Sequence, residues 1–272
     1  MFPEISLAGQ VVLVTGAGRG IGRAIALTMA EVGADLVLAA RSETELASVA
    51  AEIEMLGQRA LPVASNVAVS SHVNRLVACS LDHFGKIDVL VNCAGQFQKR
   101  PVVPLPGHQL EPPLTPDKCM TSTTDDQWRS VFAVNVDGLF YCCRAVAPSM
   151  IENRHGAIVN VSSNSAIQAA PYVAAYNASK AAVNAITKVL ALEWAEFNVR
   201  VNAIAPGEYH TQLTDFSWSD EGEKAKRLDR IPLHREGSLR QLGILTSYLA
   251  SSAADYMTGQ IVYVDGGLTA RS

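Results

Sequence analysis

Residues 15–22 read Thr15-Gly16-Ala17-Gly18-Arg19-Gly20-Ile21-Gly22, and the segments on either side of them differ in periodicity. Before them, Val11–Val14 is a short apolar, β-branched run, typical of a buried parallel strand. After them, Ile21, Ile25 and Met29 recur at helical spacing. A strand, a glycine-rich turn and a helix in this order predict the start of a dinucleotide-binding fold. A tight turn without a ligand is the alternative, and the flanking strand and helix disfavour it.

The spacing of the glycines is also informative. Gly16, Gly20 and Gly22 fit the pattern T-G-x-x-x-G-x-G and not G-x-G-x-x-G. Side chains at these positions would hold a pyrophosphate away from the backbone amides and from the helix N-terminus. We therefore expect this loop to bind a dinucleotide through Gly16, Arg19, Gly20, Ile21 and Gly22.

Tyr176 and Lys180 lie four residues apart at the start of an alanine-rich stretch with high helix propensity. On a helix, this spacing places both side chains on one face. A neighbouring ammonium group lowers the pKa of a phenol, which suits the phenol to proton transfer with a carbonyl or an alcohol. Taken alone, the pair also fits a solvent-facing lysine beside a half-buried tyrosine.

Polar residues also follow several apolar runs. Ser162 and Ser163 follow Ile158–Val161, Asn92-Cys93-Ala94-Gly95 ends another run, and Asn135 lies between two valines. With the glycine motif, the Tyr176/Lys180 pair, Pro206-Gly207 and the tail Val264-Asp265-Gly266-Gly267, these residues make the chain resemble the short-chain dehydrogenase/reductase family in its compact single-domain form. The resemblance covers nearly the whole chain, and its motifs are jointly very specific.

The resemblance implies hydride transfer between a nicotinamide cofactor and a carbonyl/alcohol pair. It implies that Tyr176 is the general acid or base and that Lys180 lowers the pKa of Tyr176 and binds the nicotinamide ribose. Ser163, chosen over Ser162 for its separation from Tyr176, would hold the substrate oxygen. Asn135 would anchor a water that relays protons through Lys180, and the alternative is an asparagine that kinks a helix or satisfies backbone groups. No metal is implied.

The resemblance also implies further cofactor contacts, at Asn66, Val67, Asn92, Ala94, Gly95, Pro206, Gly207 and Thr211. Three residues depart from the family's usual pattern. Asn66 stands where aspartate is usual, and Cys93 where asparagine is common. Glu208 stands where an apolar residue is common, so it either faces solvent or biases the polarity of the substrate.

The end of the second predicted strand bears on cofactor choice. An NAD-preferring enzyme needs an acid there to bind both ribose hydroxyls. Ala40 occupies that position and Asp35 comes too early, whereas Arg41 and Ser42 follow at once. A guanidinium suits a 2′-phosphate, and Arg19 is placed to face the same group. We expect NADP(H) to be preferred over NAD(H); the alternative is that Arg41 stacks on adenine and Arg19 is solvated, leaving either cofactor usable.

Apolar strands and amphipathic helices alternate along the chain, which predicts one doubly wound α/β domain of the Rossmann type over residues 1–272. The expected strands are Val11–Thr15, Leu36–Ala40, Ala60–Ala64, Ile87–Asn92, Ala157–Val161, Arg200–Ile204 and Gln260–Val264. The expected helices include Glu43–Leu56, Ser71–Phe84, Asp126–Glu152, Ala174–Phe197 and Leu239–Ser251. Residues 96–124 are proline-rich and aperiodic, which predicts an inserted loop, either a surface excursion or a flap over the ligand crevice.

Composition narrows the partners. A net charge of −4 argues against a nucleic-acid-binding face. No apolar run reaches the ~20 residues of a membrane span, and the first ten residues show no leader, so we expect a cytoplasmic protein. The five cysteines have no metal-ligand spacing, and we expect reduced, buried thiols. The small residues Ala178, Ala181, Ala182 and Ala185 permit close packing, and the resemblance implies that this helix pairs across a two-fold axis in a homotetramer; the alternative is that these alanines pack on their own sheet.

Other functions fit less well. A sugar-nucleotide epimerase or dehydratase would carry a T-G-x-x-G-x-x-G loop and a C-terminal substrate domain. A catalytically inactive nucleotide sensor would have lost at least one of Ser163, Tyr176, Lys180 and Asn135. An NAD-linked alcohol or polyol dehydrogenase stays open. Within the family, the chain looks most like 3-oxoacyl-carrier-protein reductases and sugar or polyol dehydrogenases, and the fold does not choose a substrate.

Overall fold

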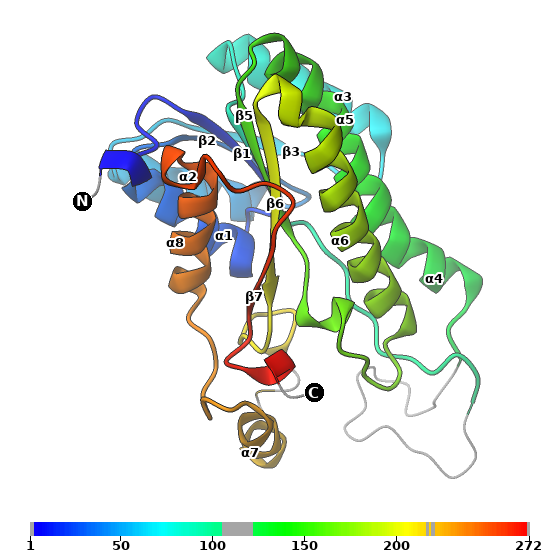
Figure 1. The fold of residues 1–272 in the computed structure, drawn as a ribbon. Helices are drawn as coiled ribbons and strands as arrows, with labels where there is room; N and C mark the ends of the chain where they lie inside the picture. Colours follow the sequence, from blue (N-terminus) through cyan, green and yellow to red (C-terminus); the bar gives the residue numbers. More distant parts are fainter. Residues whose placement is uncertain (1–2, 105–121, 216–217, 219–220, 271–272) are drawn as a thin grey trace.

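A seven-stranded parallel sheet forms the centre of the computed structural model, which describes residues 3–104, 122–215, 218 and 221–270 (Figure 1). The strand order is β3-β2-β1-β4-β5-β6-β7. This confirms the predicted doubly wound fold. The strands are β1 Val11–Thr15, β2 Asp35–Ala40, β3 Ala60–Ala64, β4 Val89–Asn92, β5 Gly156–Val161, β6 Val199–Pro206 and β7 Ile261–Val264.

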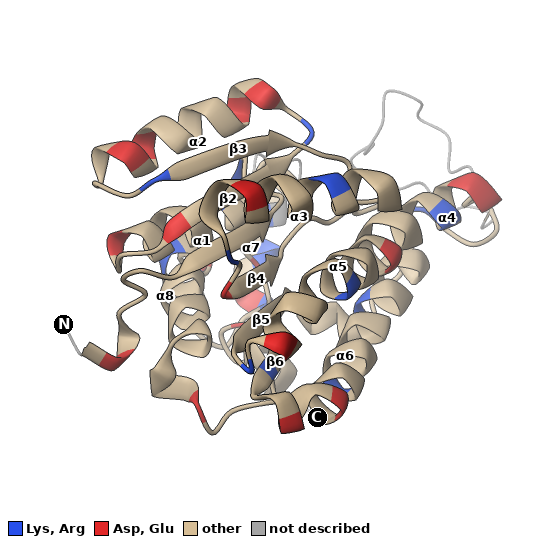
Figure 2. Ribbon diagram, turned by 90° about the horizontal axis from the view of Figure 1, so that it is seen from above, with Lys and Arg blue, Asp and Glu red and all other residues tan. Residues whose placement is uncertain are grey.

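Helices cover both faces of the sheet (Figure 2). One face carries α1 (Gly20–Glu31), α2 (Glu43–Met55) and α8 (Leu239–Ala250), and the other carries α3 (Ser70–Phe84), α5 (Gly138–Glu152) and α6 (Ala174–Trp194). The shorter helices are α4 (Asp125–Phe132) and α7 (Glu221–Arg230). Short 3-10 turns lie at Pro3–Ile5, Asn164–Ala166, Ala195–Phe197, Ser252–Ala254 and Leu268–Ala270.

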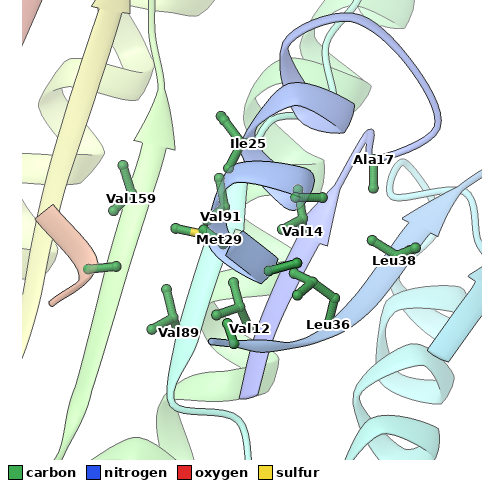
Figure 3. Packing of buried hydrophobic residues seen from close by; sticks show 14 of the residues in the cluster. Val12, Val14, Ala17, Ile25, Met29, Leu36, Leu38, Val89, Val91 and Val159 are labelled. Atoms are coloured by element: carbon green, nitrogen blue, oxygen red, sulfur yellow. The ribbon is translucent and has the colours of Figure 1, made fainter. Parts of the chain in front are cut away.

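Successive side chains of β1 point to opposite faces of the sheet, and a separate hydrophobic cluster covers each face. Val12 and Val14 pack with Ile25 and Met29 of α1, as Figure 3 shows, whereas Leu13 enters the cluster under α3 and α5. All of these side chains are at most 1% exposed. Each such burial stabilises the fold by roughly 1.5–3 kcal/mol. The strand is therefore held from both faces, and its end is a rigid platform for the glycine loop.

Apart from shifts of a few residues at the ends of several elements, two elements differ from the sequence prediction. The single helix expected over Asp126–Glu152 is interrupted by a π-helical turn at Ala133–Asp137, which holds Asn135. Such turns occur often at functional sites. Helix α7 was not predicted because it is highly charged and contains few apolar residues.

The segment Asp125–Glu152 is long and apolar enough, by length and composition only, to cross a membrane, with 44% of its most apolar window buried. A core helix passes the same test, and α5 packs its buried residues into the cluster under β4 and β5.

Two sequence expectations concern the loop after β4 and the cysteines. The expected loop at 96–124 falls largely on residues 105–121, which lie outside the described residues, so its insertion stays a prediction. Cys142 and Cys143 are buried as expected, but the prediction of buried thiols is wrong for Cys79, which lies on the solvent face of α3. Cys119 lies outside the described residues.

Candidate active site

The carboxyl ends of the parallel strands gather the candidate residues at one edge of the sheet. Thr15 at the end of β1 pairs in register with Asn92 of β4, and Asn92 pairs with Asn160 of β5. β1 lies between β2 and β4, so the chain winds outward in both directions from the β1–β4 junction. In open α/β sheets, ligands bind at such a switch point.

The glycine loop has no room for side chains at this junction. Gly16 has φ +68°, and a Cβ there would come within 2.9 Å of the Ala94 backbone. A Cβ at Gly22 would collide with the carbonyl oxygen of Gly16. No side chain caps the N-terminus of α1, whose N-cap is Arg19, so its first amides remain available to an anion. The loop therefore fits a dinucleotide pyrophosphate.

Thr15 fastens the glycine loop to the Asn92–Gly95 segment. Its Oγ1 accepts hydrogen bonds from the backbone N–H groups of Cys93 and Ala94, both at 3.1 Å. This role was missed in the sequence, although a hydroxyl at the end of an apolar strand is a signal for it. The methyl end of Thr211 lies over Gly20, where a Cβ would be 3.6 Å away, which brings Thr211 to the same loop.

Tyr176, Ser163 and Lys180 come together beside this junction. Tyr176 lies in the first turn of α6, with its ring edge-on to Phe97 at 5.0 Å between centroids. Ser163 lies close enough to Tyr176 to lower the pKa of the phenol, and its hydroxyl donates to Asn164 Oδ1 at 3.2 Å, whereas the Ser162 hydroxyl donates to Asn184 Oδ1 at 2.6 Å. Ser163 is therefore the serine that faces the tyrosine.

The Lys180 ammonium lies beneath the phenol. Its Nζ is 5.7 Å from the centroid of the Tyr176 ring and donates to the carbonyl oxygen of Val161 at 2.8 Å. Burial lowers the pKa of Lys180 to about 8. The alternative of a solvent-facing lysine is therefore wrong.

Burial dominates the acidity of Tyr176. It raises the pKa of the phenol, the hydrogen bond with Ser163 lowers it, and the nearby Glu208 and Cys93 raise it further. The net direction is opposite to that expected from the neighbouring ammonium, because desolvation penalises the phenolate. Burial also raises the pKa of the Cys93 thiol to about 12.

Asn135 bridges three elements. Its Oδ1 accepts from the Gln96 N–H at 2.7 Å, and its Nδ2 donates to the Gln96 carbonyl at 3.0 Å and to Ser179 Oγ at 2.9 Å. One role of Asn135 is thus to hydrogen-bond backbone polar groups, which was the alternative left open by the sequence. Ser179 was missed because its partner is distant in sequence.

The Asn92 side chain forms a hydrogen bond between neighbouring strands and also lines a cavity at the candidate active site. Its Nδ2 donates to Asn160 Oδ1 at 2.9 Å, and its Oδ1 is buried without a partner among the described residues. One small cavity brings several predicted residues together and is lined by Thr15, Val67, Asn92, Ala94, Val134, Asn135, Gly138, Leu139, Val161 and Lys180. Gly95 adjoins it, since a Cβ there would be 3.6 Å from Asn135 Oδ1.

The predicted adenosine side of the site lies at the ends of β2 and β3. Ser42 caps α2 by accepting from the Glu45 N–H at 3.3 Å, and Arg41 is exposed without an ion pair among the described residues. Arg19 forms an ion pair with Glu45 at 3.4 Å. Asn66 turns the chain after β3 by accepting from the Ala68 N–H at 3.2 Å.

Glu208 follows Pro206-Gly207 at the end of β6 and forms an ion pair with Arg227 of α7 at 2.6 Å. Each side chain is only about a quarter exposed, at 25% and 26%. Glu208 is therefore only partly open to solvent, and its charge lies near Tyr176. Arg227 was missed because no motif marks it.

Within the described ranges, no three histidine, cysteine or acidic side chains gather as a metal site would require.

Comparison with known proteins identifies the class. A family model described as enoyl-(acyl carrier protein) reductase matches residues 16–269. The chain belongs to the short-chain dehydrogenase/reductase family, and it is an oxidoreductase. This confirms the resemblance that the sequence motifs predict.

Particular relatives fall into two groups. The chain is 37% identical to the 3-oxoacyl-[acyl-carrier-protein] reductase FabG of Thermotoga maritima, over 96% of this chain and 98% of that protein. It is 38% identical to a glucose 1-dehydrogenase of Gluconobacter oxydans, over 96% of this chain and 92% of that protein. A gluconate 5-dehydrogenase of Burkholderia cenocepacia, solved in complex with NADP and tartrate, superposes with a TM-score of 0.89 at 32% identity, covering 99% of each chain.

Proposed function

We propose that this protein is an NADP(H)-dependent oxidoreductase that interconverts a carbonyl and an alcohol. Bound NADP(H) supplies the hydride to the carbonyl carbon or accepts it from the alcohol. The observation that carries the proposal is the convergence of Ser163, Tyr176 and Lys180 at the sheet edge beside the glycine loop.

Each residue of the site has a role in this reaction. The Tyr176 hydroxyl donates a proton to the substrate oxygen during reduction and accepts it during oxidation. The Ser163 hydroxyl holds that oxygen, since it already faces the phenol. Lys180 holds the nicotinamide ribose and influences the phenol as a nearby cation, and Asn135 positions the water through which protons reach Lys180. Because Lys180 is buried, its charge is little screened by solvent.

The edge of the sheet from β2 to β6 would hold the cofactor. The amides of Gly16, Gly20, Ile21 and Gly22 would bind the pyrophosphate, and Arg19, Arg41 and Ser42 would bind the adenosine 2′-phosphate. The remaining contacts come from Asn66, Val67, Asn92, Ala94, Gly95, Pro206, Gly207 and Thr211. The exposed guanidinium of Arg41 and the absence of an acid at Ala40 support NADP(H) over NAD(H).

The substrate is a small carbonyl compound or alcohol. The relatives are named for 3-oxoacyl thioesters of acyl carrier protein and for sugars and sugar acids, and the shared fold does not decide between them. The test is turnover of 3-oxoacyl thioesters, sugars, sugar acids and simple ketones, with NADPH and NADH in parallel. Turnover of at least one substrate supports the proposal, and tight cofactor binding with no turnover would support a sensor.

We also infer a cytoplasmic homotetramer without a nucleic-acid or membrane partner. Along α6, Ala178, Ala181 and Ala185 are exposed, and the same face continues to Val189 and Leu192, which are 50% and 83% exposed. The alternative that these alanines pack on their own sheet is therefore wrong for these three. An exposed apolar helix face of this kind suits pairing with a second copy.

A further inference from the structure

The end of β2 has no acid of its own, yet a carboxylate lies beside it. Asp35, the one acid within β2, is at the opposite end of the strand, where its carboxylate pairs with Arg59. Glu45 lies in the first turn of α2, the helix that follows β2, and its side chain is 34% exposed. The charged groups around the loop between β2 and α2 are therefore Arg41, Glu43 and Glu45, with Arg19 facing them from the glycine loop.

Glu45 extends over the glycine loop. A Cβ built on Gly18 would be 2.9 Å from Glu45 Oε2 and 3.7 Å from the Cβ of Ala40. The carboxylate and the Ala40 methyl group thus adjoin the same point of the loop. In a dinucleotide-binding fold, this end of the second strand is where the adenosine ribose binds. The carboxylate therefore stands close to where the proposed function puts the 2′-phosphate.

Arg19 is already partnered by this carboxylate. The two side chains approach to 3.4 Å, with Arg19 57% exposed. An exposed pair of this length contributes little stability, so Arg19 can leave it for a phosphate at small cost. When Arg19 leaves this ion pair, the Glu45 carboxylate keeps its negative charge. That carboxylate repels a phosphate and can accept hydrogen bonds from a hydroxyl.

We propose that Glu45 is a cofactor-selectivity residue: it supplies from α2 the carboxylate that β2 lacks, and thereby weakens NADP(H) binding while leaving a hydrogen-bond acceptor for the ribose hydroxyl of NAD(H). The inference rests on the proposed function. It means that the preference for NADP(H) is smaller than Arg19 and Arg41 alone would give.

The experiment is calorimetric titration of NADP⁺ and NAD⁺ into wild type and Glu45→Gln, which needs no substrate. Loss of one carboxylate near a phosphate in a partly screened site should tighten NADP⁺ binding by about tenfold. NAD⁺ binding should stay within about twofold or weaken. Titration with 2′,5′-ADP and with 5′-AMP isolates the contribution of the 2′-phosphate to binding. Glu45→Gln should tighten the binding of 2′,5′-ADP and leave the binding of 5′-AMP unchanged.

Glu52→Gln is the matched control. Glu52 lies about two turns further along α2 and pairs with Arg23 of α1. Glu52→Gln therefore also removes one negative charge from α2, but at a position away from the glycine loop. Equal Kd values for Glu45→Gln and Glu52→Gln, or weaker NADP⁺ binding in Glu45→Gln alone, would overturn the inference while leaving the proposed function intact. A wild type that binds neither cofactor would overturn both.

Discussion

The side chain of Asn135 binds both backbone polar groups of Gln96. The Gln96 N–H donates to Oδ1 at 2.7 Å, and Nδ2 donates to the Gln96 carbonyl oxygen at 3.0 Å. Asn135 is 2% exposed and lies in the π-helical turn between α4 and α5. The turn thus fixes the chain that leaves β4, next to Phe97 and the Tyr176 ring.

Replacing Asn135 with alanine should destabilise the fold as well as reduce turnover. The Gln96 backbone groups and Ser179 would lose their partner, which costs roughly 1–3 kcal/mol in the free energy of unfolding. Urea denaturation measures this loss. Asn153→Ala, at an exposed helix end, is the control and should change stability by less than about 0.5 kcal/mol. Equal stabilities of the two variants would show that the Asn135 bonds are not stabilising.

Glu208 should influence the pH dependence of alcohol oxidation. The groups that face Tyr176 are Ser163, Lys180, Cys93 and Glu208, and the Glu208 charge helps to raise the pKa of the phenol. Oxidation requires the deprotonated phenol, so its rate rises with pH through that pKa. Glu208→Gln lowers the pKa and should move the rise of kcat/KM to lower pH.

Arg227→Met provides the opposite change at the same ion pair. It leaves the Glu208 charge unneutralised near Tyr176, so the rise of kcat/KM should move to higher pH. Shifts in the same direction for both variants, or no shift in either, would exclude an electrostatic role for this pair.

The exposed face of α6 should be an interface between subunits. Ala185→Arg places a long charged side chain on that face and should convert the proposed tetramer to a smaller species that keeps its helical circular dichroism. Light scattering coupled to size exclusion measures the mass. Ala51→Arg, at an exposed position of α2, is the control and should leave the mass unchanged. A wild type that is monomeric at micromolar concentration would contradict this prediction.

Cofactor preference should reside at the end of β2. Wild type should use NADPH at least tenfold better than NADH in kcat/KM, which corresponds to ~1.4 kcal/mol of transition-state binding. Ala40→Asp with Arg41→Ile should lose or invert this preference, because the variant gains a ribose acceptor and loses a phosphate donor. A wild type that works better with NADH would contradict the assignment.

Local patterns in the sequence predicted most of this architecture. The β1–loop–α1 unit follows from Val11–Gly22, because its periodicity and glycines are contiguous. The i and i+4 spacing on α6 placed Tyr176 and Lys180 on one face of that helix, whereas Ser163 was chosen through the family resemblance, and the roles of all three stay predictions.

Features that depend on contacts between distant segments were not predictable. The Arg19–Glu45 and Glu208–Arg227 pairs join different elements, and no local pattern marks their partners. The direction of the Tyr176 pKa was also misjudged, because burial depends on the packing of Phe97 and the sheet edge around the phenol. Helix α7 was also not predicted, because its sequence is highly charged and contains few apolar residues.

The measurement that tests the central claim most directly is turnover by Tyr176→Phe on the best substrate of the panel, with NADPH titrated in parallel. The variant keeps the ring against Phe97 and loses only the hydroxyl. Its kcat should fall by ~10²–10⁴-fold, the usual cost of removing a positioned proton donor, whereas the Kd for NADPH should stay within about twofold. A folded variant that keeps more than about a tenth of the wild-type rate would show that Tyr176 is not the proton donor.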